Sequence, residues 1–416
     1  MYDPGLSPRS TGDVVLQGAW CGFRPRQRTR VSIVIAAGRV VEILDHPGSS
    51  SSAREGLPHI DLSGFLVMPG LINAHDHLQF ALFPRLANPP YRNYVDWGTD
   101  IHDKRRDVIA RHRAVPKAVR LWWGGIKNLL CGVTTVCHHD LLWSELRRND
   151  FPVRVVQNYG WAHSLALGGD LLAARSATPE QGPFILHACE GIDEQAHAEL
   201  AKLDQLGLLD ARTVLVHGLA IDDAGVKLIR QRRASLIVCP SSNQSLFERL
   251  PDMARLGTIE NVALGNDSPL TAEGDLLDEV RFAGRSCGID PDAIYRMVTE
   301  APAAVLRLGN QEGSITAAGV GDLMAVRDTA EVGVDRLPKL SMQDVELVMV
   351  GGRVHLASEA IMERLPAAAL QGLEPLWIDG AVRWLRAPVR DLLTKAEEVL
   401  GKGDVRLGGR PVRLPT

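Results

Sequence analysis

The sequence predicts an α/β protein, a TIM-like (β/α)8 barrel joined to a small composite β-sandwich domain that both ends of the chain build. Two observations predict it. In the middle of the chain, short apolar segments alternate with amphipathic helical segments, which is typical of parallel βα units. Both ends instead carry β-branched segments punctuated by glycine and proline, which indicate short strands and turns.

Length and charge limit the possible functions. With 416 residues, 45% of them hydrophobic, the chain can bury a large core and form one big domain with a smaller one. Its 46 basic and 50 acidic residues give a net charge of −4. Nucleic acids and anionic membranes attract basic surfaces, so we expect neither as a partner and expect a small-molecule substrate. A homodimer stays open, because no residue demonstrates one.

The cysteines and the apolar segments indicate where in the cell we expect the protein to be located. The six cysteines are scattered without a CxxC pair, and we interpret them as reduced thiols. Residues 1–18 lack the apolar core of a signal peptide, and no run of about 18 apolar residues occurs. We therefore expect a soluble, cytoplasmic protein.

Residues 1–65 are predicted to form the N-terminal part of the small β domain. Its strands are expected in the segments DVVLQGAW, RVSIVIAAGRVVEIL and HIDLSGFLV. The low-complexity patch 49–52 lies in HPGSSSSAREG and is predicted to be a loop.

Residues 66–312 are predicted to form the barrel. Helices are expected at 194–206 and 223–232. Strands are expected at 66–74, 133–137, 153–159, 184–186, 213–216, 235–239 and 262–264. These are seven strands where a closed barrel needs eight. We expect the eighth between Trp161 and Pro183, a segment too short for an ordinary βα unit, so the barrel should be irregular around strands 3–5.

The rest of the chain returns to strands. Residues 313–358 are predicted to complete the small β domain with GDLMAVRD and VELVMVGGRVHLAS. Residues 359–416 are predicted to be a C-terminal extension, whose helix at 389–400 packs on the barrel or on the β domain. No internal repeat is found.

Several predicted strands stop at a potential metal ligand, where the loops of a parallel barrel carry the chemistry. In VMPGLINAHDHL, two histidines at i and i+2 share one strand face, so their imidazoles can converge on one ion. The segments FILHACE, TVLVHG and VALGND end in the same way. The residues concerned are His75, His77, His187, Glu190, His217 and Asp267.

Each candidate has a structural alternative. His217 can be a hydrogen-bonded residue at a strand end. Glu190 can be a solvated acid stabilised by a helix dipole, and Asp267 can cap the following turn. For His75 and His77 this alternative is weak, because two imidazoles buried side by side without an ion would be an uncompensated polar cost.

These segments resemble the amidohydrolase superfamily, in the branch that holds cytosine, guanine and S-adenosylhomocysteine deaminases and the triazine hydrolases. PGLINAHDH is similar to the family's PGLIDxHxH, and GVTTV, HACE, LVHG, CPSSN and LGND follow in the family's order. EGSITAAGVGDLMAV is similar to its GSIxxGxxADLxV return to the small sheet. The resemblance covers most of the chain and implies the barrel and the composite sheet.

The resemblance also implies a metal centre. The expected ligands are His75, His77, His187 and Asp267. Three imidazoles and a carboxylate suit Zn²⁺, with Fe²⁺ or Mn²⁺ as alternatives. The binuclear branches bridge two metals with a carboxylated lysine, and this chain has no lysine between Lys127 and Lys202. We therefore expect one divalent ion.

Roles follow from the same resemblance. Glu190 is expected to move a proton from the water to the leaving nitrogen. His217 is expected to polarise the substrate or to hold the attacking hydroxide, and Asp267 to accept a proton as well as to ligate the ion.

Further polar residues are placed near the substrate. His163 is a predicted substrate contact, and Ser242 and Asn243 of CPSSN are predicted substrate-side or loop-fixing residues. His138 and His139, in VCHHD, are interpreted as structural, with the alternative that one of them points into the mouth of the barrel. An aromatic-rich insertion at 80–97 can either cover the mouth or merely pack the loop.

The sequence thus favours a metal-dependent hydrolase that acts on a carbon–nitrogen bond of a small cyclic or amidine-like substrate, as a deaminase using metal-activated water. A first alternative opens a cyclic amide or releases another leaving group with the same metal site. A second, of another class, is a catalytically silent barrel homologue that serves as a binding or assembly protein.

Overall fold

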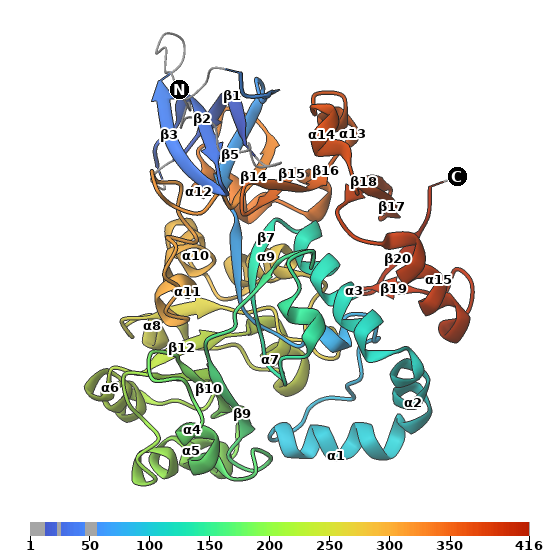
Figure 1. Ribbon diagram of the computed structural model, residues 1–416. Helices are drawn as coiled ribbons and strands as arrows, with labels where there is room; N and C mark the ends of the chain where they lie inside the picture. Colours follow the sequence, from blue (N-terminus) through green and yellow to red (C-terminus); the bar gives the residue numbers. More distant parts are fainter. Residues whose placement is uncertain (1–12, 23–25, 46–55, 416) are drawn as a thin grey trace, which may run out of the picture.

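The middle of the chain forms two sheets of parallel strands in the computed structural model, which describes residues 13–22, 26–45 and 56–415 (Figure 1). One sheet has the order β6-β7-β8 and the other β13-β12-β11-β10-β9, and every pairing in them is parallel. The strands are β6 (Leu71–Asp76), β7 (Val133–His138), β8 (Arg154–Val155), β9 (Gly160–Ser164), β10 (Phe184–Ala188), β11 (Thr213–His217), β12 (Ser235–Val238) and β13 (Val262–Leu264).

The irregularity predicted around strands 3–5 lies between β8 and β9, which do not pair with each other in the described residues. The strand predicted at 153–159 is present as β8 but is shorter than predicted, because it ends at Val155 and the next strand, β9, begins at Gly160. β9 supplies the strand that the count was missing, at the start of the window where it was expected. No helix separates β8 from β9, so the sequence between these two strands lacks the helical pattern that marks the end of a βα unit elsewhere in the chain.

The two parallel sheets meet where β13 ends beside β6. The backbone N–H of Asp267 donates to the carbonyl of His75 at 3.0 Å, and that of Asn266 donates to Oδ1 of Asn73 at 3.1 Å. Gly265 permits this approach, since a Cβ there would lie 2.6 Å from the Cβ of His75. The first and last parallel strands are therefore held together at their carboxyl ends.

Helices connect the parallel strands. The helices predicted at 194–206 and 223–232 are α5 and α6, and each begins at an aspartate that caps it, Asp193 and Asp222. None of the helices among the described residues combines the length and apolarity of a membrane span. The helices up to residue 305 are α1 (Tyr94–Lys104), α2 (Arg106–Ala114), α3 (Lys117–Leu130), α4 (Leu171–Ser176), α5 (Glu194–Gln205), α6 (Asp223–Arg232), α7 (Pro240–Phe247), α8 (Met253–Leu256), α9 (Leu276–Ser286), α10 (Pro291–Met297) and α11 (Glu300–Val305).

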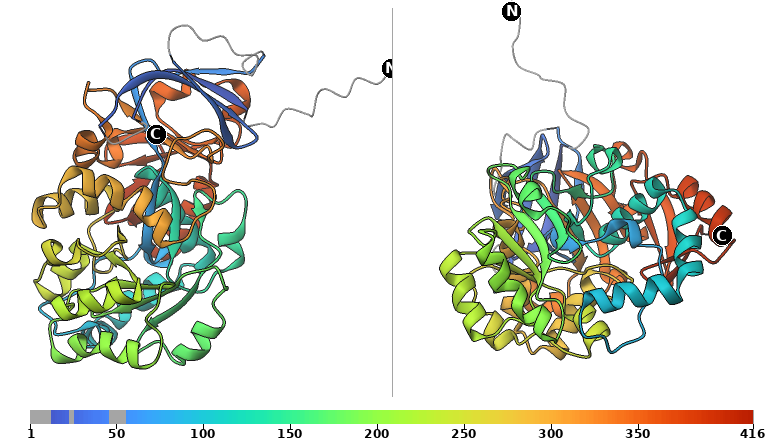
Figure 2. Two further views of the ribbon diagram at one scale, coloured as in Figure 1. Left: turned by 90° about the vertical axis from the view of Figure 1, so that its left-hand side faces the viewer. Right: turned by 90° about the horizontal axis from the view of Figure 1, so that it is seen from below.

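Both ends of the chain build one sheet, as predicted, and it lies at one end of the molecule in the left view of Figure 2. The predicted strand 66–74 is divided at Gly70 into β5, in this sheet, and β6, in the parallel sheet. The loop predicted at 49–52 lies outside the described residues. The strands of this sheet are β1 (Val14–Cys21), β2 (Thr29–Ala36), β3 (Arg39–Asp45), β4 (His59–Asp61), β5 (Phe65–Pro69), β14 (Leu323–Arg327), β15 (Val345–Val350), β16 (Arg353–Ala357), β17 (Glu374–Ile378), β18 (Ala381–Leu385), β19 (Arg406–Leu407) and β20 (Arg410–Arg413).

The C-terminal residues add more strands than the sequence indicated, since β17 to β20 extend the terminal sheet beyond β16. The predicted helix at 389–400 is α15 (Val389–Leu400), and it packs against α2, α3 and β17. The short helices of this part are α12 (Gly333–Arg336), α13 (Glu359–Met362) and α14 (Ala367–Leu370).

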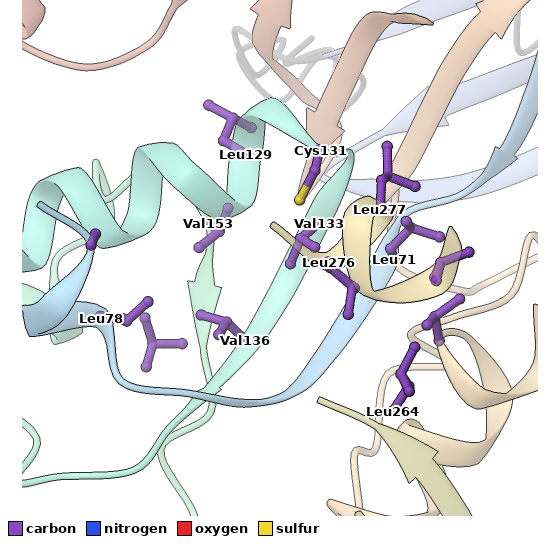
Figure 3. Packing of buried hydrophobic residues seen from close by; sticks show 14 of the residues in the cluster. Leu71, Leu78, Leu129, Cys131, Val133, Val136, Val153, Leu264, Leu276 and Leu277 are labelled. Carbon is purple, nitrogen blue, oxygen red and sulfur yellow. The ribbon is translucent and has the colours of Figure 1, made fainter. Parts of the chain in front are cut away.

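The core holds the parallel strands in place. Figure 3 shows apolar side chains of α3 and α9 packed on β6 and β7, with Leu264 of β13 nearby. Burial of each large side chain of this kind stabilises the fold by about 1.5–3 kcal/mol. The six cysteines are free thiols, as expected, and five of them are buried. Buried side chains labelled in Figure 3 include Leu71, Leu129, Val133, Val136, Leu276 and Leu277.

Candidate metal centre and active site

Three imidazoles converge at the carboxyl ends of β6 and β10. His75 and Asp76 are the last two residues of β6, and His77 follows them directly. His187 lies in β10. Each of the three residues has a ring nitrogen that lies within 4.8 Å of a ring nitrogen of the other two. Nε2 of His75 is 3.2 Å from Nε2 of His187. The predicted convergence of these three residues is therefore present in the structure.

The charge state of the three imidazoles suits a cation. Burial lowers the pKa of His75 and of His187, and it lowers that of His77 to about 4. At neutral pH the rings are therefore uncharged, and each has a nitrogen lone pair. Neutral imidazoles with facing lone pairs are the form that binds a divalent metal, so these residues fit a metal ion.

Asp267 brings a carboxylate to the same place. Its Oδ1 lies 3.7 Å from Nε2 of His75 and 3.6 Å from Nε2 of His77. Its other oxygen, Oδ2, accepts hydrogen bonds from Oγ of Ser242 at 2.7 Å and Oγ1 of Thr271 at 3.2 Å. Two hydroxyls thus bind Oδ2 of Asp267, and Oδ1 faces the imidazoles.

The ionisation of Asp267 follows from the same contacts. Burial by itself raises the pKa of this carboxyl, but the nearby imidazoles of His75, His77 and His217 outweigh burial and hold the pKa well below its usual range. The carboxylate is therefore anionic at neutral pH and can ligate a cation.

Glu190 and His217 lie next to the three imidazoles. Nε2 of His217 is 3.6 Å from Oε1 of Glu190, and Nδ1 of His217 is 3.0 Å from Oδ1 of Asn243. An amide oxygen only accepts, so Nδ1 of His217 carries the proton. Burial lowers the pKa of His217, which leaves Nε2 of the neutral ring as an acceptor, and burial raises the pKa of Glu190 well above its usual value.

Backbone strain marks the same strand ends. Cys189, His217 and Asp267 have φ angles of +55°, +76° and +60°, in the left-handed region that non-glycine residues rarely adopt. Such strain costs roughly 1–3 kcal/mol per residue and persists where the surrounding structure enforces it, often at functional sites.

A cavity of about 290 Å³ opens beside this cluster. Its wall near the imidazoles is polar, and its outer wall is mainly apolar, with side chains from η2 (Leu78–Phe80), α1 and α2. The insertion at 80–97 thus does line the cavity. Lining residues include His77, His139, His163, His187, Glu190, His217 and Asp267 at the polar end and Phe80, Phe83, Leu86, Trp97, Ile101 and Leu270 at the apolar end.

The three predicted substrate contacts occupy different places. His163 lines the cavity, with its ring 4.9 Å from that of His187 between centroids. Ser242 and Asn243 are buried behind it and hydrogen-bond Asp267 and His217. They hold site residues in place, which agrees with the loop-fixing alternative, and their contact with substrate stays a prediction.

One site residue was interpreted as structural from the sequence, with a position at the mouth as its alternative, and another was not identified. His139 lines the cavity and stacks on His187 at 4.3 Å between centroids, while its Nε2 donates to the carbonyl of Ala162 at 3.1 Å. Its position at the end of β7, in VCHHD, was a usable signal. Thr271 had none, because a threonine in a loop is unremarkable in sequence.

A buried ion pair behind the site was also missed. Nζ of Lys127, on α3, lies 3.0 Å from Oδ2 of Asp76 and donates to Oδ1 of Asn266 at 2.6 Å. Amide groups of Asn73 and Asn128 donate to the same Asp76 oxygen at 3.1 and 2.8 Å. Asp76 stands between two of the clustered histidines in the chain, and Asn266 precedes Asp267, so this network fixes the backbone that carries them.

Comparisons with known proteins agree with this arrangement. A family model described as "Amidohydrolase family" matches residues 174–355. An imidazolonepropionase of Thermoplasma acidophilum is 22% identical over 76% of this chain and 86% of its own length. A 5-methylthioadenosine/S-adenosylhomocysteine deaminase of Natronomonas pharaonis is 29% identical over 73% of this chain and 81% of its own length.

Solved structures share the fold. An adenosine deaminase from Xanthomonas campestris with bound zinc superposes with a TM-score of 0.69 at 17% identity, over 94% of this chain and 98% of that one. The atrazine chlorohydrolase TrzN from Arthrobacter aurescens, in complex with zinc, gives a TM-score of 0.69 at 14% identity, over 93% and 99%. At these identities the likeness establishes the architecture alone.

Proposed function

Since the chain belongs to the amidohydrolase family and is an enzyme that acts on carbon–nitrogen bonds, we propose that it is a metal-dependent aminohydrolase that deaminates a small cyclic or amidine-like substrate. The observation that carries the proposal is the cluster of three neutral imidazoles and Asp267 beside a cavity that Glu190 and His217 line. The two parallel sheets are then the two arcs of one (β/α)8 barrel, with this cavity at its mouth.

His75, His77, His187 and Asp267 would hold one divalent ion. Zn²⁺ is the ion of choice, because nitrogen and oxygen donors suit it and zinc is named in two of the similar structures, with Fe²⁺ and Mn²⁺ as alternatives. When bound, such an ion lowers the pKa of a coordinated water from about 15.7 to about 7 and acts as a Lewis acid.

Glu190 is assigned the proton transfer. Burial raises its pKa and so favours the protonated carboxyl, which is the form that a general acid needs before it protonates a leaving nitrogen. Asp267 is assigned as the base that accepts the first proton from the attacking water; hydroxyls hold its Oδ2, and its Oδ1 faces the imidazoles.

His217 is assigned the orientation of the attacking water. Its Nδ1 proton is fixed on Asn243, so the Nε2 that faces Glu190 accepts a hydrogen bond and does not donate one. Of the two roles expected for His217, holding the water fits this tautomer, whereas polarising a substrate oxygen requires a donor.

One alternative is supported by a specific observation. The imidazolonepropionase relative indicates that a hydrolase of this type can act on an imidazolone. Opening a cyclic amide uses the same ligands and the same proton transfer, but it releases no ammonia. The catalytically silent alternative is set aside, because the chain is an enzyme of the family.

The test is ammonia release by the zinc-loaded enzyme across purines, pyrimidines, pterins and triazines, with ring-opened products measured in parallel. Glu190→Gln should lower kcat/KM by about 10²- to 10⁴-fold with an unchanged zinc content. Glu180→Gln, at an exposed position, is the matched control and should behave as the parent. Ring-opened product without ammonia, or full activity of Glu190→Gln, would overturn the proposal.

A further inference from the structure

A second pocket of about 470 Å³ lies beside β8, where the parallel strands meet the hairpin of β15 and β16. It shares no lining residue with the cavity of the metal centre. Its wall comes from residues 146–149, from β8 and its neighbours, and from the turn and strand at 350–355. We call it the arginine pocket, after the four arginines among its lining residues, Arg147, Arg148, Arg154 and Arg353.

The lining of the arginine pocket has no carboxylate to balance these four guanidinium groups. Within the described residues, Arg147 and Arg353 have no carboxylate within ion-pair distance. Two positive charges therefore face a concave surface without a partner. Both side chains are exposed and line the pocket, so an anion that enters it can accept charge-assisted hydrogen bonds from them.

The other two arginines are held by acids outside the lining. Arg148 forms a bidentate pair with Asp150 at 2.8 and 2.7 Å. Arg154 pairs with both oxygens of Asp322, which is buried and also accepts from the backbone N–H of Gly351 at 2.7 Å. These pairs fix the walls of the pocket and leave Arg147 and Arg353 to bind the ligand.

A buried histidine adds a second requirement. His355 is only 4% exposed, lines the pocket and has its Nδ1 2.8 Å from the carbonyl of Pro152. A carbonyl accepts, so Nδ1 carries the proton. Burial, and after it the charges of nearby arginines, lowers the pKa of His355 to about 4, so the neutral ring has Nε2 as an acceptor without a partner among the described residues.

The ligand must therefore accept hydrogen bonds from guanidinium groups and donate one to an imidazole. We propose that the arginine pocket is a binding site for a phosphate group that retains a proton, with its oxygens on Arg147 and Arg353 and its P–OH donating to Nε2 of His355. Phosphate keeps such a proton at neutral pH, whereas sulfate carries a similar charge and has none. The pocket should therefore distinguish these two anions.

The experiment is calorimetric titration of the full-length, zinc-loaded enzyme with inorganic phosphate and with sulfate at equal ionic strength. The parent should bind one phosphate at this site at least tenfold more tightly than sulfate. The double variant Arg147→Ala with Arg353→Ala should weaken phosphate binding at least tenfold. Its control, Arg230→Ala with Arg249→Ala, removes the same charge from exposed positions without side-chain ion pairs and should bind as the parent does.

The comparison of variants separates this site from the metal centre, which can also attract phosphate. Binding at the metal is the same in the parent and in the Arg147/Arg353 variant, so only the difference between them belongs to the arginine pocket. Phenyl phosphate, titrated in parallel, has a second pKa of about 6, so most of it lacks a P–OH at neutral pH and it should bind more weakly than inorganic phosphate. Equal binding of phosphate by the parent and the double variant, or equal binding of phosphate and sulfate by the parent, overturns the proposal. The result does not depend on the proposed deamination.

Discussion

The buried pair of Lys127 and Asp76 behind the metal centre leads to a quantitative prediction for Lys127→Met. Lys127 is 2% exposed and Asp76 is 0% exposed, so the variant leaves a carboxylate in the core with only amide donors. Breaking a buried pair from one side costs about 3–5 kcal/mol. The unfolding entropy of about 2.1 cal/mol/K per residue gives about 0.9 kcal/mol/K for 416 residues, so Tm should fall by about 3–6 °C.

The metal centre should respond as well, because Lys127 also holds Asn266, the residue before Asp267. Loss of a group that orients a metal ligand typically lowers metal affinity about 10- to 100-fold. Adding Asp76→Asn to Lys127→Met removes both charges, so the double variant should recover part of the lost stability without recovering the lost zinc affinity, since Asn266 still lacks its donor.

Calorimetry of the zinc-free protein and zinc competition with a chromophoric chelator measure these two effects separately. Lys202→Met, on the exposed face of α5, is the control and should change the unfolding free energy by no more than about 0.5 kcal/mol. A Lys127→Met protein with the stability and zinc affinity of the parent would refute the reasoning. So would a double variant less stable than Lys127→Met.

Two further predictions concern pH and metal removal. Burial raises the pKa of Glu279 to about 8 from an ordinary value of 4.5, so the folded protein binds this proton more tightly than the unfolded chain. The stabilising contribution of this protonated carboxyl is complete below about pH 4.5 and is lost as the pH rises through 8, by up to about 5 kcal/mol. In urea melts, the unfolding free energy of the Glu279→Gln variant should lose this pH dependence. The same pH dependence in the parent and the variant would contradict the prediction. Chelation of the metal should abolish turnover and lower Tm, and readdition of Zn²⁺ at 100 times its Kd should restore about 2.7 kcal/mol; a Tm indifferent to zinc would count against the assigned ligands.

The sequence predicted the ligand-bearing strand ends because their signals are local. His75 and His77 share one strand face, and the apolar runs that end at His187 and Asp267 need no knowledge of distant residues. The helices α5 and α6 were predicted for a similar reason, since a capping aspartate and an apolar period mark each of them. Local pattern thus gave the parallel architecture and most of the cluster.

Features that depend on distant contacts were not predicted. Lys127 and Asp76 lie 51 residues apart in the chain, and nothing near either residue indicates the other. Arg154 and Asp322 are 168 residues apart, so this wall of the arginine pocket could not be predicted from the sequence either. The early end of the predicted strand 153–159 was missed because no proline or helix follows β8, and Asn158 and Gly160 alone were too weak a turn signal.

The metal site is organised by the protein before any ion binds. The backbone of Asp267 donates to the carbonyl of His75, so ligands from the last and first parallel strands are tied together directly. Oδ1 of Asn73 accepts from the backbone N–H groups of both His75 and Asn266, at 3.4 and 3.1 Å, and strengthens the same junction. An ion that enters this site orders few side chains, because the strands and hydrogen bonds have already restricted them. We therefore expect zinc affinity to depend on the packing between β6 and β13 as well as on the donor atoms themselves.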